Sequence, residues 1–233
     1  MDRMKPGAPR IVDLTLPLVH GMRGVEIETA RTLAADGWNA TTLRLYSHAG
    51  THMDAPAHFE AGGRTIDDVS LEACMGPARV ADLRGLAPRA VIGVAHLGEV
   101  AARLVPGEGL LLRTGWSAHA ADPGLYRDGL PRVSEELARW CVERRVKVLG
   151  VEPPSVADVN DIRELTAVHH ILLQGGVVIV EGLANLEALG EERVFFVAAP
   201  LKVRGGDGAP ARAFALAGGE AAWSAWSAGR ADL

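Results

Sequence analysis

The second half of the chain alternates apolar, strand-like runs with helical segments. Apolar residues at 109–114 and a β-branched run at 177–180 are typical of strands covered on both faces. Residues 134–145 begin with Ser134, a good helix N-cap, and end in two arginines, which predicts a helix. A strand is predicted directly after it, at 146–151. Because strand, helix and strand succeed one another, the sequence predicts an α/β core with at least one crossover connection.

Further elements are expected on both sides of this core. Alternating polar and apolar residues predict half-buried strands at 11–16 and 41–46, and apolar residues spaced i, i+3, i+4 predict helices. Residues 20–29 and 115–132 are expected to be irregular. The remaining predicted elements are strands at 79–83, 194–197 and 212–216 and helices at 97–104 and 165–174.

Length and charge limit the class of protein. The 233 residues suit a single domain, and 48% hydrophobic residues are enough to bury a sizeable core. A net charge of −5 shows no basic face for nucleic acid, so a small-molecule partner is expected.

The N-terminal residues lack the apolar segment of a signal peptide, and no apolar run reaches the roughly 20 residues that span a bilayer. We therefore expect a cytoplasmic protein without membrane attachment. In that setting a disulfide is not expected, and Cys74 and Cys141 are predicted to be buried thiols.

Residues 47–59 hold three of the eight histidines and one aspartate. Gly50 and Pro56 disfavour a helix there, so the stretch is predicted to be a loop anchored by the strand before it. Imidazoles and a carboxylate suit zinc or manganese, and three protein ligands leave one position open for water. The predicted ligands are His48, His52 and Asp54, with His58 following.

Two further candidates lie on core elements. His169 shares a helical face with Leu165, Val168 and Leu172, so it is predicted to point toward the core. Glu181 ends the β-branched strand, where a buried carboxylate needs an ion pair, hydrogen bonds or a metal. On spacing alone, a metal ligand and a salt bridge to a surface arginine are equally good interpretations of Glu181.

Residues 48–59, HAGTHMDAPAHF, resemble the signature His-x-Gly-Thr-His-x-Asp-x-Pro-x-His-Phe of the metal-dependent cyclase family, which includes bacterial kynurenine formamidases and isatin hydrolases. The pair His169-His170, followed by an apolar strand and Glu181, resembles a second family motif. Segments at 112–117, 150–155 and 200–210 also resemble family landmarks. The resemblance runs from about residue 11 to about residue 216.

The resemblance implies an α/β fold with a mixed sheet, of the swivelling β/β/α type. We expect one domain over residues 1–233, with the tail 217–233 outside the matched region. The resemblance also implies that His169 and Glu181 complete a second metal position, with Asp54 bridging two ions. The sequence itself leaves the number of ions open. A homodimer or larger homo-oligomer is expected from the same resemblance.

The predicted activity is metal-dependent hydrolysis of an amide, a lactam or a related carbonyl compound. A divalent ion would lower the pKa of bound water to about 7 and polarise the carbonyl, and His58 would transfer the proton. Two alternatives stay open: a lyase or ring-closing cyclase that stabilises an enolate, and a non-catalytic metal- or ligand-binding protein. No G-x-S-x-G motif is present.

Three features have no assigned role. Glu152 stands where many relatives carry aspartate, His20 lies in a predicted loop, and Trp223 and Trp226 either cap the fold or contact a neighbouring subunit. Residues 18–24 also lack the aromatic, Pro-Gly-Asp-containing segment of kynurenine formamidases. The chain is therefore predicted to be an inefficient N-formylkynurenine hydrolase.

Overall fold

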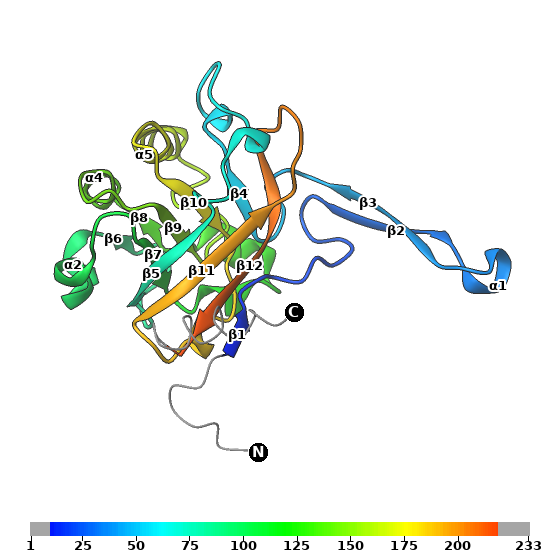
Figure 1. The fold of residues 1–233 in the computed structure, drawn as a ribbon, viewed down its shortest axis with the longest axis horizontal. Helices are drawn as coiled ribbons and strands as arrows, with labels where there is room; N and C mark the ends of the chain where they lie inside the picture. The colour runs from blue at the N-terminus through cyan, green and yellow to red at the C-terminus, as the bar shows by residue number, and fades with distance from the viewer. Residues whose placement is uncertain (1–9, 219–233) are drawn as a thin grey trace, which may run out of the picture.

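The computed structural model describes residues 10–218, and its centre is a sheet of eight strands (Figure 1). These strands are β1 (Arg10–Asp13), β4 (His52–Asp54), β5 (Met75–Asp82), β7 (Gly109–Arg113), β9 (Val148–Val151), β10 (Val178–Glu181), β11 (Arg193–Pro200) and β12 (Gly208–Ala217). Hydrogen bonds place them in the order β1-β12-β11-β5-β7-β9-β10-β4. Because β4 also pairs with β12, seven of them close into a barrel-like core.

The sheet is mixed. Its strands β5, β7, β9 and β10 run parallel, whereas β4, β11 and β12 pair with their neighbours in antiparallel fashion. Helices α2 (Glu99–Arg103), α4 (Glu135–Glu143) and α5 (Ile162–Gln174) lie beside the parallel strands in Figure 1. The predicted α/β class with a mixed sheet is confirmed.

The parallel strands are buried on both faces, which explains their continuous apolar sequence. In β7, Leu110 and Leu112 pack into a cluster with Leu137 of α4, under the helices. The residue between them, Leu111, packs into a second cluster with Phe196 of β11. Successive side chains of one strand therefore serve two hydrophobic cores.

Strand β4 closes the barrel. His52 lies opposite Glu181 of β10 on one side and opposite Pro210 of β12 on the other. The sequence predicted a loop for 47–59, which is wrong for its central part, because two neighbouring strands supply partners for this backbone. Residues Pro56–His58 then form a 3₁₀ helix, η1.

An antiparallel hairpin of β2 (Val25–Arg31) and β3 (Ala40–Leu45), with α1 (Leu33–Asp36) at its tip, projects away from the sheet (Figure 1). We refer to residues 25–45 as the arm. Two expectations fail here. Residues 20–29 are not irregular throughout, and the strand predicted at 41–46 is exposed rather than half-buried. The reason is that, among the residues that the structure describes, β3 pairs with β2 alone and four of its six residues are exposed.

Short elements complete the described chain. The segment 115–132, predicted to be irregular, contains η4 (Trp116–His119) and α3 (Pro123–Asp128), which Asp122 caps by accepting from the Leu125 N–H. The others are β6 (Val91–Ile92) paired in parallel with β8 (Arg132–Val133), η2 (Ile66–Asp68), η3 (Val94–Leu97) and η5 (Leu186–Ala188).

Cys74 and Cys141 are free and buried as predicted, and burial raises the pKa of Cys141 to about 12. Within residues 10–218, no helix has the length and apolar character needed to cross a bilayer. Trp223 and Trp226 lie outside the described residues.

Candidate metal centre

Five parts of the fold bring the six predicted residues together. His52 and Asp54 are two apart on β4, so both side chains point to the same face of the strand. The antiparallel register then sets His52 opposite Glu181, at the end of β10. His48 comes from the turn before β4, His58 from η1 and His169 from the buried face of α5.

The deepest part of the centre consists of His52, Asp54, His169 and Glu181, which we call the inner group. His52 Nε2 lies 3.1 Å from Glu181 Oε2 and 3.7 Å from Asp54 Oδ1. His169 Nε2 lies 3.5 Å from Glu181 Oε1 and 3.6 Å from Asp54 Oδ2. All four side chains are buried. Each imidazole therefore faces both carboxylates.

Backbone carbonyls determine which nitrogen of each inner histidine faces the carboxylates. His52 Nδ1 donates to the Gly50 carbonyl at 2.9 Å, and His169 Nδ1 donates to the Leu165 carbonyl at 2.7 Å. In a neutral ring, a proton on Nδ1 leaves the lone pair on Nε2. Both Nε2 atoms are thus directed at the carboxylates as metal ligands would be.

Two buried atoms of the inner group, His52 Nε2 and Asp54 Oδ2, have no hydrogen-bond partner within residues 10–218. The contact from His52 to Glu181 is short enough for an ion pair but lacks the direction of a hydrogen bond. An unpartnered polar atom in the interior costs about 1–3 kcal/mol. Nitrogen and oxygen donors in this arrangement fit a divalent ion such as zinc or manganese.

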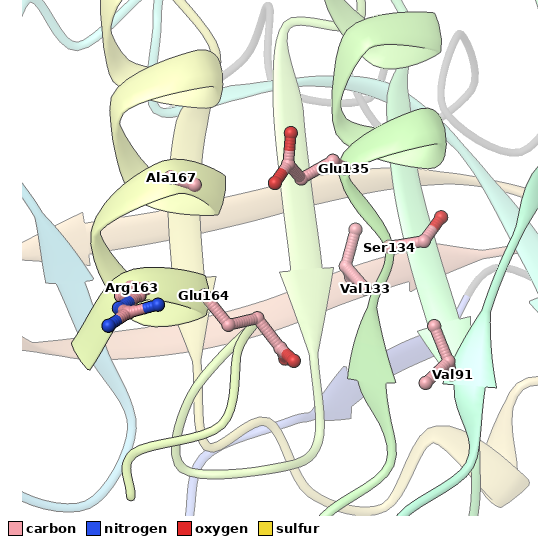
Figure 2. A pocket seen from close by; sticks show the side chains of 7 residues that line it. All are labelled: Val91, Val133, Ser134, Glu135, Arg163, Glu164 and Ala167. Atoms are coloured by element: carbon pink, nitrogen blue, oxygen red, sulfur yellow. The ribbon is translucent and has the colours of Figure 1, made fainter. Parts of the chain in front are cut away.

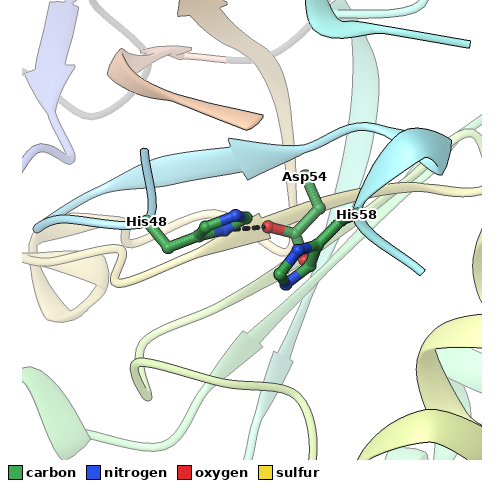
Figure 3. A group of neighbouring side chains, drawn as sticks. All are labelled: His48, Asp54 and His58. Carbon is green, nitrogen blue, oxygen red and sulfur yellow. Dashed lines mark hydrogen bonds and ion pairs between the residues drawn. The ribbon is translucent and has the colours of Figure 1, made fainter. Parts of the chain in front are cut away.

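His48 and His58 form the more exposed side of the centre. His48 Nδ1 lies 2.9 Å from Asp54 Oδ1, and the two imidazole rings stack with centroids 3.9 Å apart at 27°. Figure 3 shows both rings beside the Asp54 carboxylate. Ligand atoms of His48, Asp54 and His58 lie within 4.8 Å of one another, as do those of His52, Asp54 and Glu181. Asp54 belongs to both sets.

Charge and burial shift the pKa values of these groups in opposite directions. Burial lowers the pKa of His48, but its hydrogen bonds to Asp54 and Asp207 outweigh burial and raise the pKa to about 9. For His58, burial and the neighbouring His48 and His169 together lower the pKa, against the attraction of Asp54. Burial opposes the charge of Glu181, yet its two histidine contacts hold its pKa below the ordinary value.

The structure arranges the predicted residues differently from the sequence. The sequence grouped His48 with His52 and Asp54, and treated His169 and Glu181 as a second position. In the structure Asp54 lies beside both His52 and His48. His52 also faces His169 and Glu181 across the inner group, whereas His48 stacks on His58. No surface arginine pairs with Glu181 among residues 10–218, since its partners are His52, His169 and the Val156 N–H at 2.7 Å.

Sequence reasoning missed Asp207, which precedes β12. Its Oδ2 atom lies 3.0 Å from His48 Nε2 and 3.5 Å from His58 Nδ1. The available signal was a carboxylate inside the turn Gly205-Gly206-Asp207-Gly208, within the segment 200–210 that resembles a family landmark.

Glu152 and His20, which have no role assigned from the sequence, form hydrogen bonds outside the metal centre. Glu152 is fully buried and accepts from the Thr114 and Ser117 hydroxyls at 3.1 and 2.8 Å and from the Gly115 N–H. It therefore anchors the loop after β7. His20 Nδ1 accepts from the Ile27 N–H at 3.1 Å, at the base of the arm.

A separate pocket lies between the first turns of α4 and α5 (Figure 2). It contains no histidine and none of the six predicted residues. Its lining is Val91, Val133, Ser134, Glu135, Arg163, Glu164 and Ala167.

Known proteins share both the sequence and the fold. Residues 12–158 match the family model described as putative cyclase. A kynurenine formamidase of Salinibacter ruber is 35% identical over 175 residues, which cover 75% of this chain and 78% of that protein. A kynurenine formamidase of Bacillus cytotoxicus is also 35% identical, with the same coverage.

Among solved structures, isatin hydrolase A from Ralstonia solanacearum is 27% identical, with a TM-score of 0.77 over 90% of this chain and 92% of that one. A potential metal-dependent hydrolase with cyclase activity is 28% identical, with a TM-score of 0.72 over 90% and 98%. These relatives confirm the predicted class, a metal-dependent hydrolase that cleaves amides. The chain belongs to the putative cyclase family.

Proposed function

We propose that the chain hydrolyses the C–N bond of a small amide, lactam or related carbonyl compound at this centre. The observation that carries the proposal is the inner group, in which two buried carboxylates and two Nε2 atoms converge and two atoms lack hydrogen bonds. Relatives named kynurenine formamidase and isatin hydrolase support this substrate class.

We assign five residues to holding a divalent ion, zinc or manganese: His48, His52, Asp54, His169 and Glu181. The chemistry that such an ion supplies when bound is activation of water near neutral pH and polarisation of the substrate carbonyl. Asp54 is the residue that two ions would share, because it lies in both sets of potential ligands. Burial of the inner group keeps its carboxylates away from competing water.

His58 is assigned the proton transfer. Its side chain keeps about 25% of its surface exposed, whereas the inner histidines keep 2%, so a substrate reaches His58 more readily. The imidazole takes a proton from the attacking water and returns it to the leaving nitrogen. A ring that also served as a metal ligand would have no lone pair free for this task, so metal content separates the two roles.

Metal-dependent turnover tests the function. The protein is stripped with a chelator, reloaded with zinc or manganese, and assayed on formanilides and small lactams. We expect turnover only in the reloaded protein, with release of the free amine. Bound metal without turnover of any member of the panel would contradict the hydrolase assignment for these substrates.

We also propose that the chain self-associates through the arm. A two-stranded hairpin is marginally stable in water on its own, and Leu33, Trp38 and Leu43 are each more than half exposed on it. A second copy of the chain, which is present wherever the first is, would cover these side chains. A cytoplasmic location and the extent of the domain, 1–233, stay predictions from the sequence.

Light scattering at micromolar concentration tests self-association through the arm. We expect a dimer or larger oligomer for the unmodified chain and a shift toward the single chain for Trp38→Ser. Ile162→Ser removes an equally exposed apolar side chain at the start of α5 and serves as the control. A single-chain mass for the unmodified protein would refute self-association.

A further inference from the structure

We propose that Asp207 is a positioning residue of the metal centre, which fixes the ring of His48 from outside and orients His58 for proton transfer. The second part rests on the proposed function, because it takes His58 as the proton carrier. The first part concerns the geometry of His48 alone.

The backbone around Asp207 is held firmly against the ligand segment. The Asp207 carbonyl accepts from the Ala55 N–H at 3.0 Å, directly after β4. The next residue, Gly208, lies opposite Asp54 in the β12–β4 pairing. Strand pairing therefore places the Asp207 side chain beside the ligands, although His48 is 159 positions away in sequence.

The packing of His48 against this turn leaves no spare room. A Cβ atom at Gly208 would lie 2.8 Å from His48 Cε1 and 2.8 Å from the Met53 carbonyl. Such distances are too short for carbon contacts, so only glycine permits the ring to lie here. The turn is thus shaped around the His48 ring and holds the Asp207 carboxylate next to it.

Asp207 accepts from the outer nitrogen of His48. The distance from His48 Nε2 to Asp207 Oδ2 is 3.0 Å, and the other nitrogen, Nδ1, lies 2.9 Å from Asp54. A proton held on Nε2 leaves the Nδ1 lone pair facing Asp54, where a cation is expected. Backbone carbonyls likewise hold a proton on the Nδ1 atoms of His52 and His169. A carboxylate acceptor such as Asp207 also makes the histidine that donates to it a more basic metal ligand.

The same Oδ2 atom lies 3.5 Å from His58 Nδ1. The His58 ring is confined between this carboxylate and the stacked ring of His48, whose centroid is 3.9 Å away. With Nδ1 turned to Asp207, Nε2 is the nitrogen left to exchange a proton. A carboxylate on the far nitrogen favours the positively charged ring that forms in that exchange.

Asp207→Asn is the test variant, since asparagine keeps the shape and removes the charge. Asp67→Asn is the matched control, because Asp67 Oδ1 accepts from the Gly205 N–H at 2.9 Å and anchors the same turn without touching a histidine. Zinc affinity is measured on both, with Zn²⁺ competing against a chelating dye. We expect about 10- to 100-fold weaker zinc binding for Asp207→Asn and no change for Asp67→Asn.

Turnover at saturating zinc tests the proposed effect of Asp207 on proton transfer by His58. The leaving nitrogen takes a proton in both reactions, but expulsion of aniline from formanilide depends more on that proton than expulsion of the less basic 4-nitroaniline from 4-nitroformanilide. We expect Asp207→Asn to lower kcat more for formanilide than for its nitro analogue, with little change in KM, and Asp207→Glu to recover part of the loss. A merely structural role would slow both substrates equally.

Unchanged zinc affinity in Asp207→Asn, or an equal loss in Asp67→Asn, would overturn the role toward His48. Equal slowing of the two formanilides would overturn the role toward His58. If the unmodified protein binds zinc but cleaves neither formanilide, the proposed substrate class fails, and the zinc titration still decides the role of Asp207.

Discussion

Strands β3 and β4 are neighbours in sequence but have opposite surroundings. Only residues 46–51 separate them, yet β4 is fully buried and β3 is largely exposed. β3 pairs with one partner that is local in sequence, whereas β4 pairs with β10 and β12, which are distant. The proposed metal ligands His52 and Asp54 lie on the strand with the distant partners, which flank it on both sides.

The two strands differ in how many neighbours depend on their side chains. An exposed hairpin tolerates change in its side chains, since few neighbours depend on them. A strand between two others fixes each side chain against residues from elsewhere in the chain.

The largest effect is expected at His52, at the centre of β4. His52→Ala removes one Nε2 ligand and leaves two carboxylates facing each other in a buried site. We expect loss of bound metal by elemental analysis and turnover no higher than in the chelated protein. His96→Ala, an exposed histidine in η3, is the control. Equal metal content in His52→Ala and the unmodified protein would remove His52 from the ligands.

His58→Ala is expected to have the next largest effect. The variant keeps its metal, because the inner group is intact, and loses turnover by roughly a hundredfold to ten-thousandfold, as expected for proton transfer. Metal content and kcat are measured on the same sample. Loss of metal would identify His58 as a ligand, and unchanged turnover would exclude both roles.

The stability of the two strands should differ by several kcal/mol. Met53 of β4 is fully buried and contacts Cys74, so Met53→Ala is expected to cost about 2–5 kcal/mol. Thr42 of β3 is exposed, so Thr42→Ala should change stability by about 0.5 kcal/mol or less. Urea unfolding of the metal-free proteins measures both. Equal costs would contradict the contrast between the strands.

The smallest effect concerns the substrate. Leu18 and Met22, which precede the arm, lie 2.8 and 3.9 Å from where a Cβ of Gly50 would be, beside the ligand segment. Neither side chain is aromatic, and an aromatic surface is worth on the order of 0.5–1.5 kcal/mol beyond area burial. We expect inefficient hydrolysis of N-formylkynurenine. Steady-state kinetics with kcat/KM above about 10⁴ M⁻¹s⁻¹ would show this expectation to be wrong.

Much of the fold was predictable because its signals are local. The β-branched run before Glu181 forms strand β10 as predicted. Ser134 is the N-cap of α4 as predicted, and its side chain accepts from the Leu137 N–H. The four close-set candidates at 48–58 lie in one centre with His169 and Glu181. These predictions depend on residue type and spacing, which the sequence states directly.

The errors come from partners that are distant in sequence. β4 was taken for a loop because its strand partners are β10 and β12, which no local pattern reveals. The alternation of polar and apolar residues predicted that β3 is a strand. It did not predict that β3 is exposed, because burial depends on what packs against the strand. Asp207 was missed for the same reason, since only the β12–β4 pairing brings it to the histidines.

The position of β4 as the strand that joins β10 to β12 also bears on the order of folding. Pairing residues 52–54 with residues 208–210 closes a long stretch of chain, and such distant contacts form slowly. The inner group is therefore assembled only when the barrel closes. An ion bound there favours the closed state over every open one by mass action. Loss of the ion should therefore favour separation of the closing strand.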